Sequence, residues 1–415
     1  MTDALPGSKF DPMSAEAKAD PGKFYSELRA ACPFYHREGA KYDFWMLSDY
    51  GQIKNEILND RTVGDWTFKY GNSLRTYAHN TGIVTDTPEH DKWRSFLMPA
   101  VVQPTLKSLD PVIKDLAEEI IDAMLAKGGE AELHDDFALP LTGQVMCIML
   151  GAPRENYKLY KHWGDELMMG IYDDPESGRD RAVYPEFAEH FIAMVNERRD
   201  LAAKAGVSEP TDEHVGTILS DDFLSRMLAA RIDGRPLTDA EIANMCATFL
   251  TAGQETSTSL IMNCVWRLQQ ERETRWERVV ANPDLVKIAI EESLRFDPPV
   301  LGQCRAATRE VEMHGATIPP KGRLFFSIAG ANRDPGIFHD PDSFSLDRPL
   351  GEAMKHLSFG WGSHLCIGAP LARLDARIGI AALIRRVPTL RMTTGETRRI
   401  HPWMNWGRNY MPVSW

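Results

Sequence analysis

The chain has 415 residues, of which 43% are hydrophobic and 26% are charged, and this composition is typical of a globular protein with a buried core. A formal net charge of −12 argues against nucleic acid as the main partner, because phosphate binding requires a dense basic face. The sequence has no run of about eighteen apolar residues, so no membrane span is predicted. Residues 1–6 have neither a basic nor an apolar signal segment, so we expect a cytoplasmic protein.

The first long helix is predicted in the second hundred residues. Apolar side chains recur at helical spacing from Leu109 to Met124, and Gly128 and Gly129 end the run. Because repeats, low-complexity tracts and long linkers are lacking, we predict a single domain, 1–415, in which residues 1–20 form a loosely ordered N-terminal segment.

A second long helix is predicted from Thr238 to about Gln270. Thr238 and Glu241 form a capping-box pattern at its start. A helix of this length, roughly 33 residues, spans about 50 Å. Its centre, residues 251–259, is poor in strong helix formers, so we expect a local distortion there.

The C-terminal third is predicted to contain the strands. Alternating apolar residues predict strands at 311–313 and 324–328, joined through turn sequences. Residues 329–365 are predicted to be ordered, irregular coil, and 369–386 a helix. The fold class is therefore mainly α with a smaller β-rich part.

The cysteines do not form a metal-binding or disulfide pattern. None is part of a CxxC pair and their spacing is irregular; they lie at positions 32, 147, 246, 264, 304 and 366. Cys366 lies in a glycine-rich loop, Phe359–Gly368, just before a predicted helix. Backbone N–H groups at a helix start favour a thiolate, and an anionic sulfur in such a loop is a suitable iron ligand. The alternative is a buried structural cysteine.

The loop carries the pattern F-G-x-G-x-H-x-C-x-G, with Phe359, Gly360, His364, Cys366 and Gly368 at its fixed positions. Through this pattern the chain resembles the cytochrome P450 family over about residues 20–415. The resemblance implies the P450 fold and a haem b whose iron is bound by the thiolate of Cys366. The haem would lie between a long distal helix and a proximal helix that follows the cysteine loop, with Phe359, Gly360 and Gly368 beside it.

Other landmarks of the family occur in the expected order. Glu292 and Arg295 match the family's ExxR pair, and Arg348 resembles the third member of that triad. On a helix, i and i+3 share one face, and the resemblance implies a buried, structural ion network that holds the coil before the cysteine loop. ExxR by itself is common as a solvated surface pair.

The resemblance also implies partners for the two haem propionates. His90 and Arg94 match an HxxxR element, while Arg305 and His364 occupy further positions of this kind. Buried carboxylates require compensation, which charge-assisted hydrogen bonds from arginine or histidine supply. For each residue a surface salt bridge is the alternative.

The centre of the second long helix resembles the oxygen-activation motif A-G-x-(D/E)-T. Small Ala252 and Gly253 would leave room for dioxygen and loosen the helix. Thr256 and Glu255 would then deliver protons for cleavage of the O–O bond. For Thr256 the alternative is a hydroxyl bonded to the i−4 carbonyl of its own helix.

An intact acid–alcohol pair implies a dioxygen-dependent monooxygenase that needs two external electrons. The 49 residues after Cys366 leave no room for a fused reductase, so we expect a separate ferredoxin and an NAD(P)H-dependent ferredoxin reductase. Arg94, Lys355, Arg373 and Arg377 are candidates for a basic docking patch, or are solvated charges. The enzyme is expected to be monomeric.

The resemblance indicates pocket segments but no substrate. These segments are the loop at 64–87, 167–171, Thr248 and Ala252, 300–303, and the turn at 404–405; the individual candidates are Met168, Met169, Thr248, Leu301, Gln303, Met404 and Asn405. Methionine-rich walls suit an adaptable apolar cavity, but such residues are equally core. Hydroxylation or epoxidation of a small-to-medium hydrophobic substrate is the leading hypothesis. Desaturation, aryl coupling, reduction of nitric oxide and a non-catalytic haem gas sensor stay open as alternatives.

Overall fold

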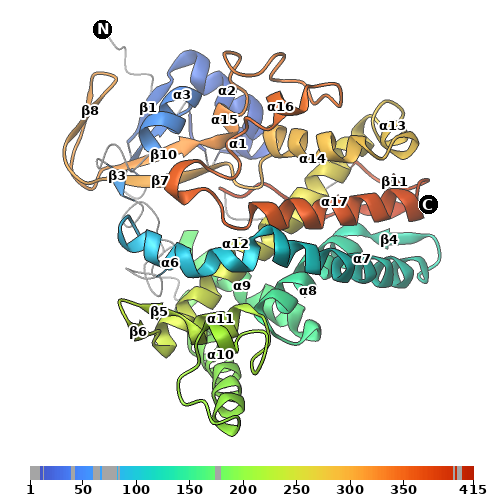
Figure 1. The fold of residues 1–415 in the computed structure, drawn as a ribbon. Coiled ribbons are helices and arrows are strands. Elements are labelled where there is room, and N and C mark those ends of the chain that lie inside the picture. Colours follow the sequence, from blue (N-terminus) through green and yellow to red (C-terminus); the bar gives the residue numbers. More distant parts are fainter. Residues whose placement is uncertain are drawn as a thin grey trace. The chain divides into compact units, whose positions relative to one another are not determined.

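The computed structural model describes residues 10–12, 14–38, 43–58, 66–67, 82, 85–172, 179–395, 398–399 and 404–415. Their contacts divide the chain into two compact units. The first unit comprises Met1–Ser73, Ser259–Cys366 and Leu383–Trp415, and the second comprises Leu74–Thr258 and Ile367–Ala382. Figure 1 shows the elements of both units.

The main sheet of the first unit has the strand order β1-β2-β10-β7-β3. The strands are β1 (Phe34–Arg37), β2 (Phe44–Leu47), β10 (Arg323–Ser327), β7 (Gly302–Ala307) and β3 (Trp66–Thr67). β10 pairs in parallel with β2 and antiparallel with β7. Since side chains alternate between the two faces of a strand, Leu324 and Phe326 share one face and pack in a common core cluster with Leu47 and Trp45.

The remaining strands of the first unit form small pairs. β8 (Val311–Met313) and β9 (Ala316–Ile318) make a hairpin whose turn residues, His314 and Gly315, have φ values of 52° and 77°, as tight hairpin turns require. β11 (Arg391–Met392) pairs with β14 (Pro412–Ser414), and β12 (Arg398–Arg399) pairs with β13 (Arg408–Tyr410). Helices of this unit are α1 (Ala15–Ala19), α2 (Pro21–Ala31), α3 (Tyr50–Gln52), the π-helix η1 (Ile53–Ile57), α13 (Trp276–Ala281) and α14 (Leu285–Phe296).

The second unit is built mainly from helices. They are α6 (Glu89–Leu97), η3 (Met98–Val101), α7 (Gln103–Leu125), η4 (His134–Ala138), α8 (Leu139–Leu150), η5 (Arg154–Asn156), α9 (Tyr157–Tyr172), α10 (Arg179–Lys204), η6 (Asp212–His214) and α11 (Phe223–Ala229). Short strands in this unit are β4 (Glu130–Glu132), β5 (Arg231–Ile232) and β6 (Arg235–Pro236). Aromatic side chains hold α9 against α10: Tyr160 and Trp163 contact His190 and Phe187, and the Tyr160 hydroxyl lies 2.9 Å from Nε2 of His190.

Two helices pass from one unit into the other, namely α12 (Asp239–Gln270) and α17 (Ala369–Arg386). Both match the predicted helices, and α7 covers the predicted Leu109–Met124 run. The predicted capping box is present, because the backbone N–H of Thr238 donates to Glu241 Oε2 (2.8 Å) and that of Glu241 donates to Thr238 Oγ1 (3.2 Å).

One local prediction was wrong and another stays a prediction. The predicted distortion in the middle of α12 does not interrupt the helix, since residues 239–270 form one continuous α-helix. Its threonine hydroxyls are accommodated by hydrogen bonds to i−4 carbonyls, at Thr248, Thr251, Thr256 and Thr258. Residues 329–365 also include short helices, α15 (Ile328–Ala331), α16 (Leu350–Ala353) and the 3₁₀ turn η7 (Gly362–His364), because local i→i+3 and i→i+4 bonds satisfy backbone groups within a long connection.

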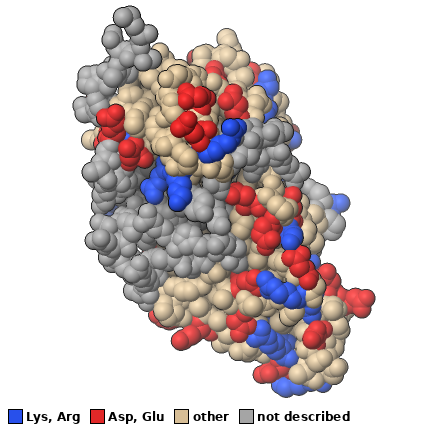
Figure 2. Space-filling view, turned by 90° about the vertical axis from the view of Figure 1, so that its left-hand side faces the viewer, with Lys and Arg blue, Asp and Glu red and all other residues tan. Residues whose placement is uncertain are grey.

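Within the described ranges, no helix is both long enough and apolar enough to cross a membrane. On the face drawn in Figure 2, lysine and arginine side chains lie among aspartate and glutamate side chains. The described part of this face therefore presents mixed charge rather than the dense basic surface that nucleic-acid binding requires.

Candidate functional site

The loop before α17 is closed by its own backbone hydrogen bonds. The N–H of Cys366 donates to the carbonyl of Phe359 (2.8 Å), and that of Gly360 donates to Leu357 (2.8 Å). Gly360 and Gly362 both have φ = 72°, a left-handed conformation that side chains with a Cβ rarely adopt. The loop therefore needs its glycines to present Cys366 three residues before α17 begins.

Cys366 differs in its surroundings from the other five cysteines. All six lie in described segments, and Cys366 alone is exposed. Burial raises the thiol pKa of Cys147 to about 12 and that of Cys304 to about 11, and it also raises the pKa of Cys246 and Cys264. These four thiols stay protonated at neutral pH and are poor metal ligands, since a metal binds the thiolate. Cys366 is therefore the one exposed cysteine among the six.

The structure brings Glu292, Arg295 and Arg348 together as a buried ion network. Arg295 makes two bonds to the Glu292 carboxylate, at 2.7 and 2.8 Å, and Nε of Arg348 donates to Glu292 Oε2 at 2.9 Å. The exposed fractions of the side chains are 0%, 0% and 4%. Because every charge has a close counter-charge, the cost of burial is offset.

The same arginine fixes the coil that leads to the cysteine loop. Arg295 donates to the carbonyls of Asn332 (3.1 Å), Pro341 (2.7 Å) and Ser343 (2.8 Å). Asn332 in turn accepts the N–H of Leu357 through Oδ1 (2.7 Å) and donates to the hydroxyl of Ser358 (2.9 Å). The ion network on α14 is thus connected by hydrogen bonds to the residues directly before Phe359.

The predicted propionate partners are largely removed from solvent. In the second unit, His90 on α6 is 1% exposed and Arg94 is half-buried. In the first unit, Arg305 on β7 is 3% exposed and His364 in η7 is half-buried. The Arg305 guanidinium donates to the carbonyl of Cys304 (3.0 Å). Desolvated cationic side chains favour anionic ligands such as carboxylates.

On α12, the hydroxyl of Thr256 donates to the carbonyl of Ala252 (2.6 Å), which is the arrangement of the alternative interpretation. The hydroxyl oxygen can still accept a hydrogen bond. Gly253 permits close packing against α8, because an added Cβ would lie 2.8 Å from Sδ of Met146. In this structure the small size of Gly253 permits close packing of α12 against Met146.

Glu255, the residue directly before Thr256 on the same helix, is paired with a lysine that the sequence motifs did not predict. Lys161 Nζ on α9 lies 2.8 Å from Oε2 of Glu255 and 2.5 Å from Oδ2 of Asp165. Burial alone would lower the pKa of Lys161, but Glu255 and Asp165 raise it above its ordinary value. The i,i+4 spacing of Lys161 and Asp165 was visible in the sequence, but such pairs are usually solvated.

The candidate pocket residues divide between the two units. In the first unit, the N–H of Leu301 donates to the carbonyl of Met404 (2.7 Å) and Val300 forms a β-bridge with Asn405. Leu301, Met404 and Asn405 are buried, and Oε1 of Gln303 is buried without a hydrogen-bond partner among the described residues.

In the second unit, the Thr248 hydroxyl donates to Asn244 (2.9 Å) and Met168 is half-buried. The side chain of Met169 and most of the loop at 64–87 lie outside the described residues.

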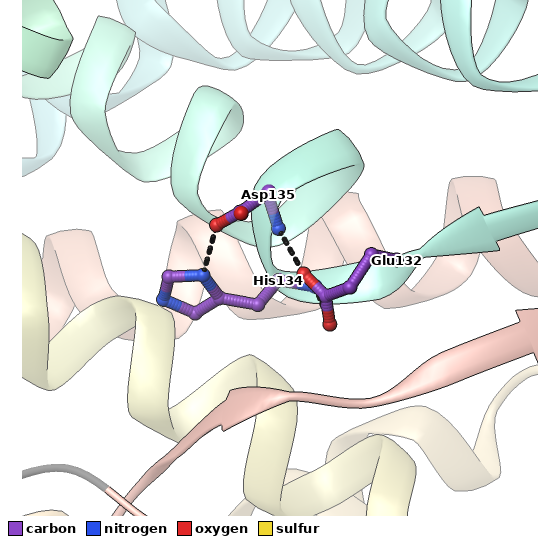
Figure 3. Close-up of side chains that lie close together, drawn as sticks. All are labelled: Glu132, His134 and Asp135. Carbon is purple, nitrogen blue, oxygen red and sulfur yellow. Dashed lines mark hydrogen bonds and ion pairs between the residues drawn. The ribbon is translucent and has the colours of Figure 1, made fainter. Parts of the chain in front are cut away.

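Glu132, His134 and Asp135 form a cluster with the spacing of metal ligands (Figure 3). The Glu132 carboxylate accepts the backbone N–H groups of His134 (3.3 Å) and Asp135 (2.8 Å), and the His134 ring contacts Asp135 at 2.6 Å. The carboxylate therefore caps the first turn of η4, and the cluster has a structural explanation.

A family model described as "Cytochrome P450" matches residues 17–404. The biotin biosynthesis cytochrome P450 of Bacillus subtilis (strain 168) is 30% identical over 390 residues, which cover 93% of this chain and 93% of that protein. The erythromycin C-12 hydroxylase of Saccharopolyspora erythraea is 33% identical over 319 residues, 76% of this chain and 75% of that protein.

Among solved structures, the chain is similar to P450BioI in complex with an acyl carrier protein ligated to hexadec-9Z-enoic acid. The TM-score is 0.82 at 27% identity, covering 97% of this chain and 100% of that chain. This chain belongs to the cytochrome P450 family. It is a haem-containing oxidoreductase of the monooxygenase class with the P450 fold.

Taken by itself, each unit carries side chains of the kind that a haem requires. In the first unit, the exposed Cys366 follows a turn of left-handed glycines. Burial raises the thiol pKa of Cys147 and Cys304, so these two cysteines stay protonated. Buried His90 and Arg305 supply cationic or hydrogen-bonding groups of the kind that two propionates require.

Proposed function

We propose that the thiolate of Cys366 binds the iron of haem b in a dioxygen-dependent monooxygenase. The exposure of this residue, in a chain whose other cysteines are buried or half-buried, is the observation that carries the proposal. As a ligand, the Cys366 thiolate would push electron density toward the iron. Bound haem supplies insertion of one oxygen atom into a C–H or C=C bond.

The chain's own side chains hold the cofactor. His90, Arg94, Arg305 and His364 would neutralise the propionates through charge-assisted bonds. Phe359, Gly360 and Gly368 would contact the cofactor beside Cys366. The Glu292 network keeps the preceding coil in place, because it holds carbonyls of that coil through Arg295.

Proton delivery is assigned to two residues of α12. The Thr256 hydroxyl donates a hydrogen bond to the carbonyl of Ala252. Its oxygen can therefore accept a hydrogen bond from the solvent side and pass a proton on. Glu255 supplies that proton, and its carboxylate is kept in one position by Lys161.

Electrons would come from a separate ferredoxin and its NAD(P)H-dependent reductase in the cytoplasm, with the enzyme acting as a monomer. Arg94, Lys355, Arg373 and Arg377 are the proposed docking cations. Arg377 already contacts Asp110 (3.0 Å), so a ferredoxin carboxylate would compete with that pair. Exposed pairs of this kind contribute little free energy, so the competition costs little.

The substrate is proposed to be a small-to-medium hydrophobic molecule. The names of similar proteins include an erythromycin hydroxylase and an enzyme bound to an acyl chain on its carrier. The candidate residues of this chain are mostly apolar, and Gln303 and Asn405 offer polar contacts for one group of the substrate; Met168, Met169, Thr248, Leu301 and Met404 complete the set.

The decisive test is spectroscopic. Reduced protein with carbon monoxide should show the red-shifted Soret band of a thiolate haem, and Cys366→Ala should lose it while Cys304→Ala keeps it. Survival of the band in Cys366→Ala would refute the ligand assignment. A library of hydrophobic compounds, scored by the low-to-high-spin shift, then identifies the substrate class, and product analysis separates oxygen insertion from desaturation or aryl coupling.

A further inference from the structure

The turn at 404–406 and the segment at 299–301, both in the first unit, are joined directly to each other. Three backbone contacts connect them: the Leu301 N–H with the Met404 carbonyl (2.7 Å), the Trp406 N–H with the Pro299 carbonyl (2.8 Å), and the β-bridge of Val300 with Asn405. A shift of one segment therefore moves the other. The candidate pocket residues Leu301, Met404 and Asn405 move with them.

Asn263 of α12 holds both segments through its side-chain amide. Nδ2 donates to the carbonyl of Trp406 (2.8 Å) and to that of Asp297 (3.1 Å). Oδ1 accepts a hydrogen bond from Nη1 of Arg408 (2.6 Å). An amide has two N–H donors, so this side chain uses both of them on the two segments. Because the side chain is 0% exposed, water does not take over these bonds.

An aromatic ring and a carboxylate keep this anchor in place. The guanidinium carbon of Arg408 lies 3.5 Å from the centroid of the Trp266 ring, and such a cation–π contact is stronger where the cation is desolvated. Nε1 of Trp406 donates to Oδ1 of Asp297 (3.1 Å), and Nη2 of Arg267 donates to the same oxygen (2.9 Å). Burial alone would raise the pKa of Asp297, but Arg267 and Arg408 lower it below its ordinary value. Asp297 is therefore ionised at neutral pH and accepts both bonds.

We propose that Asn263 is a positioning residue that sets the separation of the two pocket segments, and thereby the length of apolar substrate that the enzyme accepts. Its N–H groups hold the turn at 404–406 against the chain at 297–301. Arg408 fixes the orientation of the amide, because a guanidinium only donates and must face Oδ1. A site wall is defined most sharply when its supporting side chains are themselves held by packing and hydrogen bonds. This inference rests on the proposed pocket of a haem-containing monooxygenase.

Asn263→Asp separates the two ends of the amide. The carboxylate keeps the size of the side chain and the bond from Arg408, but an ionised carboxylate has no N–H to donate, so the bonds to both carbonyls are lost. Gln269→Glu is the matched control, because Gln269 lies on the same helix, is 7% exposed and donates through Nε2 to the carbonyl of Leu390 (3.1 Å). Trp406→Phe removes only the indole N–H of the turn and carries the test if Asn263→Asp incorporates haem poorly.

Two measurements report the turn and the pocket separately. Hydrogen exchange of the Leu301 and Trp406 amides reports the two backbone bonds that join the segments. Binding of N-alkylimidazoles with chains of increasing length reports the pocket of the haem-loaded enzyme, because the free ring nitrogen ligates the iron and shifts the Soret band while the chain occupies the pocket. Imidazole itself has no chain and reports access to the iron alone.

We expect Asn263→Asp and Trp406→Phe to speed the exchange of both amides and to shift the chain length that binds best. The alkylimidazole that binds the parent most tightly should bind these variants about tenfold or more weakly, the lower range for one misfitted methylene in an apolar pocket. Binding of imidazole and the carbon monoxide spectrum should not change. Gln269→Glu should bind each imidazole as the parent does.

Each outcome decides the inference. Unchanged exchange and an unchanged chain-length preference in Asn263→Asp and Trp406→Phe would overturn the proposal. So would an equal loss of affinity for imidazole and every alkylimidazole, which would show a general effect on the fold, or the same chain-length shift in Gln269→Glu, which any buried charge on α12 would then cause. A parent enzyme without a Soret shift would instead contradict the proposed haem chemistry, and the exchange measurement would decide alone whether Asn263 holds the turn.

Discussion

Replacing Glu292 by glutamine perturbs the ion network that holds the coil before the cysteine loop. The substitution preserves side-chain size but removes the carboxylate that Arg295 and Arg348 both contact. The side chains of Glu292 and Arg295 are 0% exposed and that of Arg348 is 4% exposed, so water cannot replace the lost counter-charge.

The expected cost follows from this burial. Removing one partner of a buried ion pair destabilises a protein by about 3–5 kcal/mol, because the remaining charge is left uncompensated. We therefore expect Glu292→Gln to lower the free energy of unfolding by about 3–5 kcal/mol. Arg278→Gln is the control: Arg278 pairs with Asp347 at 2.6 Å, but with exposed fractions of 42% and 73%. An exposed pair contributes about 0.2–1 kcal/mol.

The assay is urea unfolding of the haem-loaded protein, followed by circular dichroism and Soret absorbance. Hydrogen exchange of residues 332–345 provides a local measurement, because Arg295 binds carbonyls in that segment. Faster exchange there should accompany the loss of stability. A cost for Glu292→Gln no larger than that for Arg278→Gln would refute the reasoning that burial makes this network important.

Three further predictions concern α12 and its start. Thr256→Ala should release peroxide instead of product while leaving the melting temperature within about 2 °C; tight coupling would contradict the proton-delivery role. Gly253→Val should destabilise the fold by about 1–3 kcal/mol through overpacking, since an added Cβ meets Met146, and Met146→Ala should recover part of this loss in chemical unfolding. The Arg235 guanidinium lowers the pKa of Glu241 to about 2 from 4.5, so its contribution to stability is complete above pH 4.5 and is lost as the pH falls toward 2. Glu241→Gln should flatten that part of the stability profile, and an unchanged acid profile would argue against the pair.

Features set by neighbouring residues were predictable from the sequence. The Thr238–Glu241 capping box, the end of α7 before Gly128 and the helix that follows Cys366 all depend on bonds within a few residues. The glycine spacing around Cys366 was equally readable, because a left-handed backbone excludes most other residues.

Contacts between distant segments were decided by the tertiary structure. The pairing of Lys161 with Glu255 joins α9 to α12, and Gly253 faces Met146 of α8. A residue's own neighbours do not specify either contact, because each depends on how two helices pack.

The sequence by itself thus determined the type of each long element, the cysteine loop and the chemistry that its motif implies. The tertiary structure decided which charges are buried together, as for Glu292 with Arg348, 56 residues apart. It also decided that Lys161 pairs with Glu255. The physical reason is range: backbone propensity and capping act over about one helical turn, whereas burial and ion pairing depend on distances in space that only the folded chain defines.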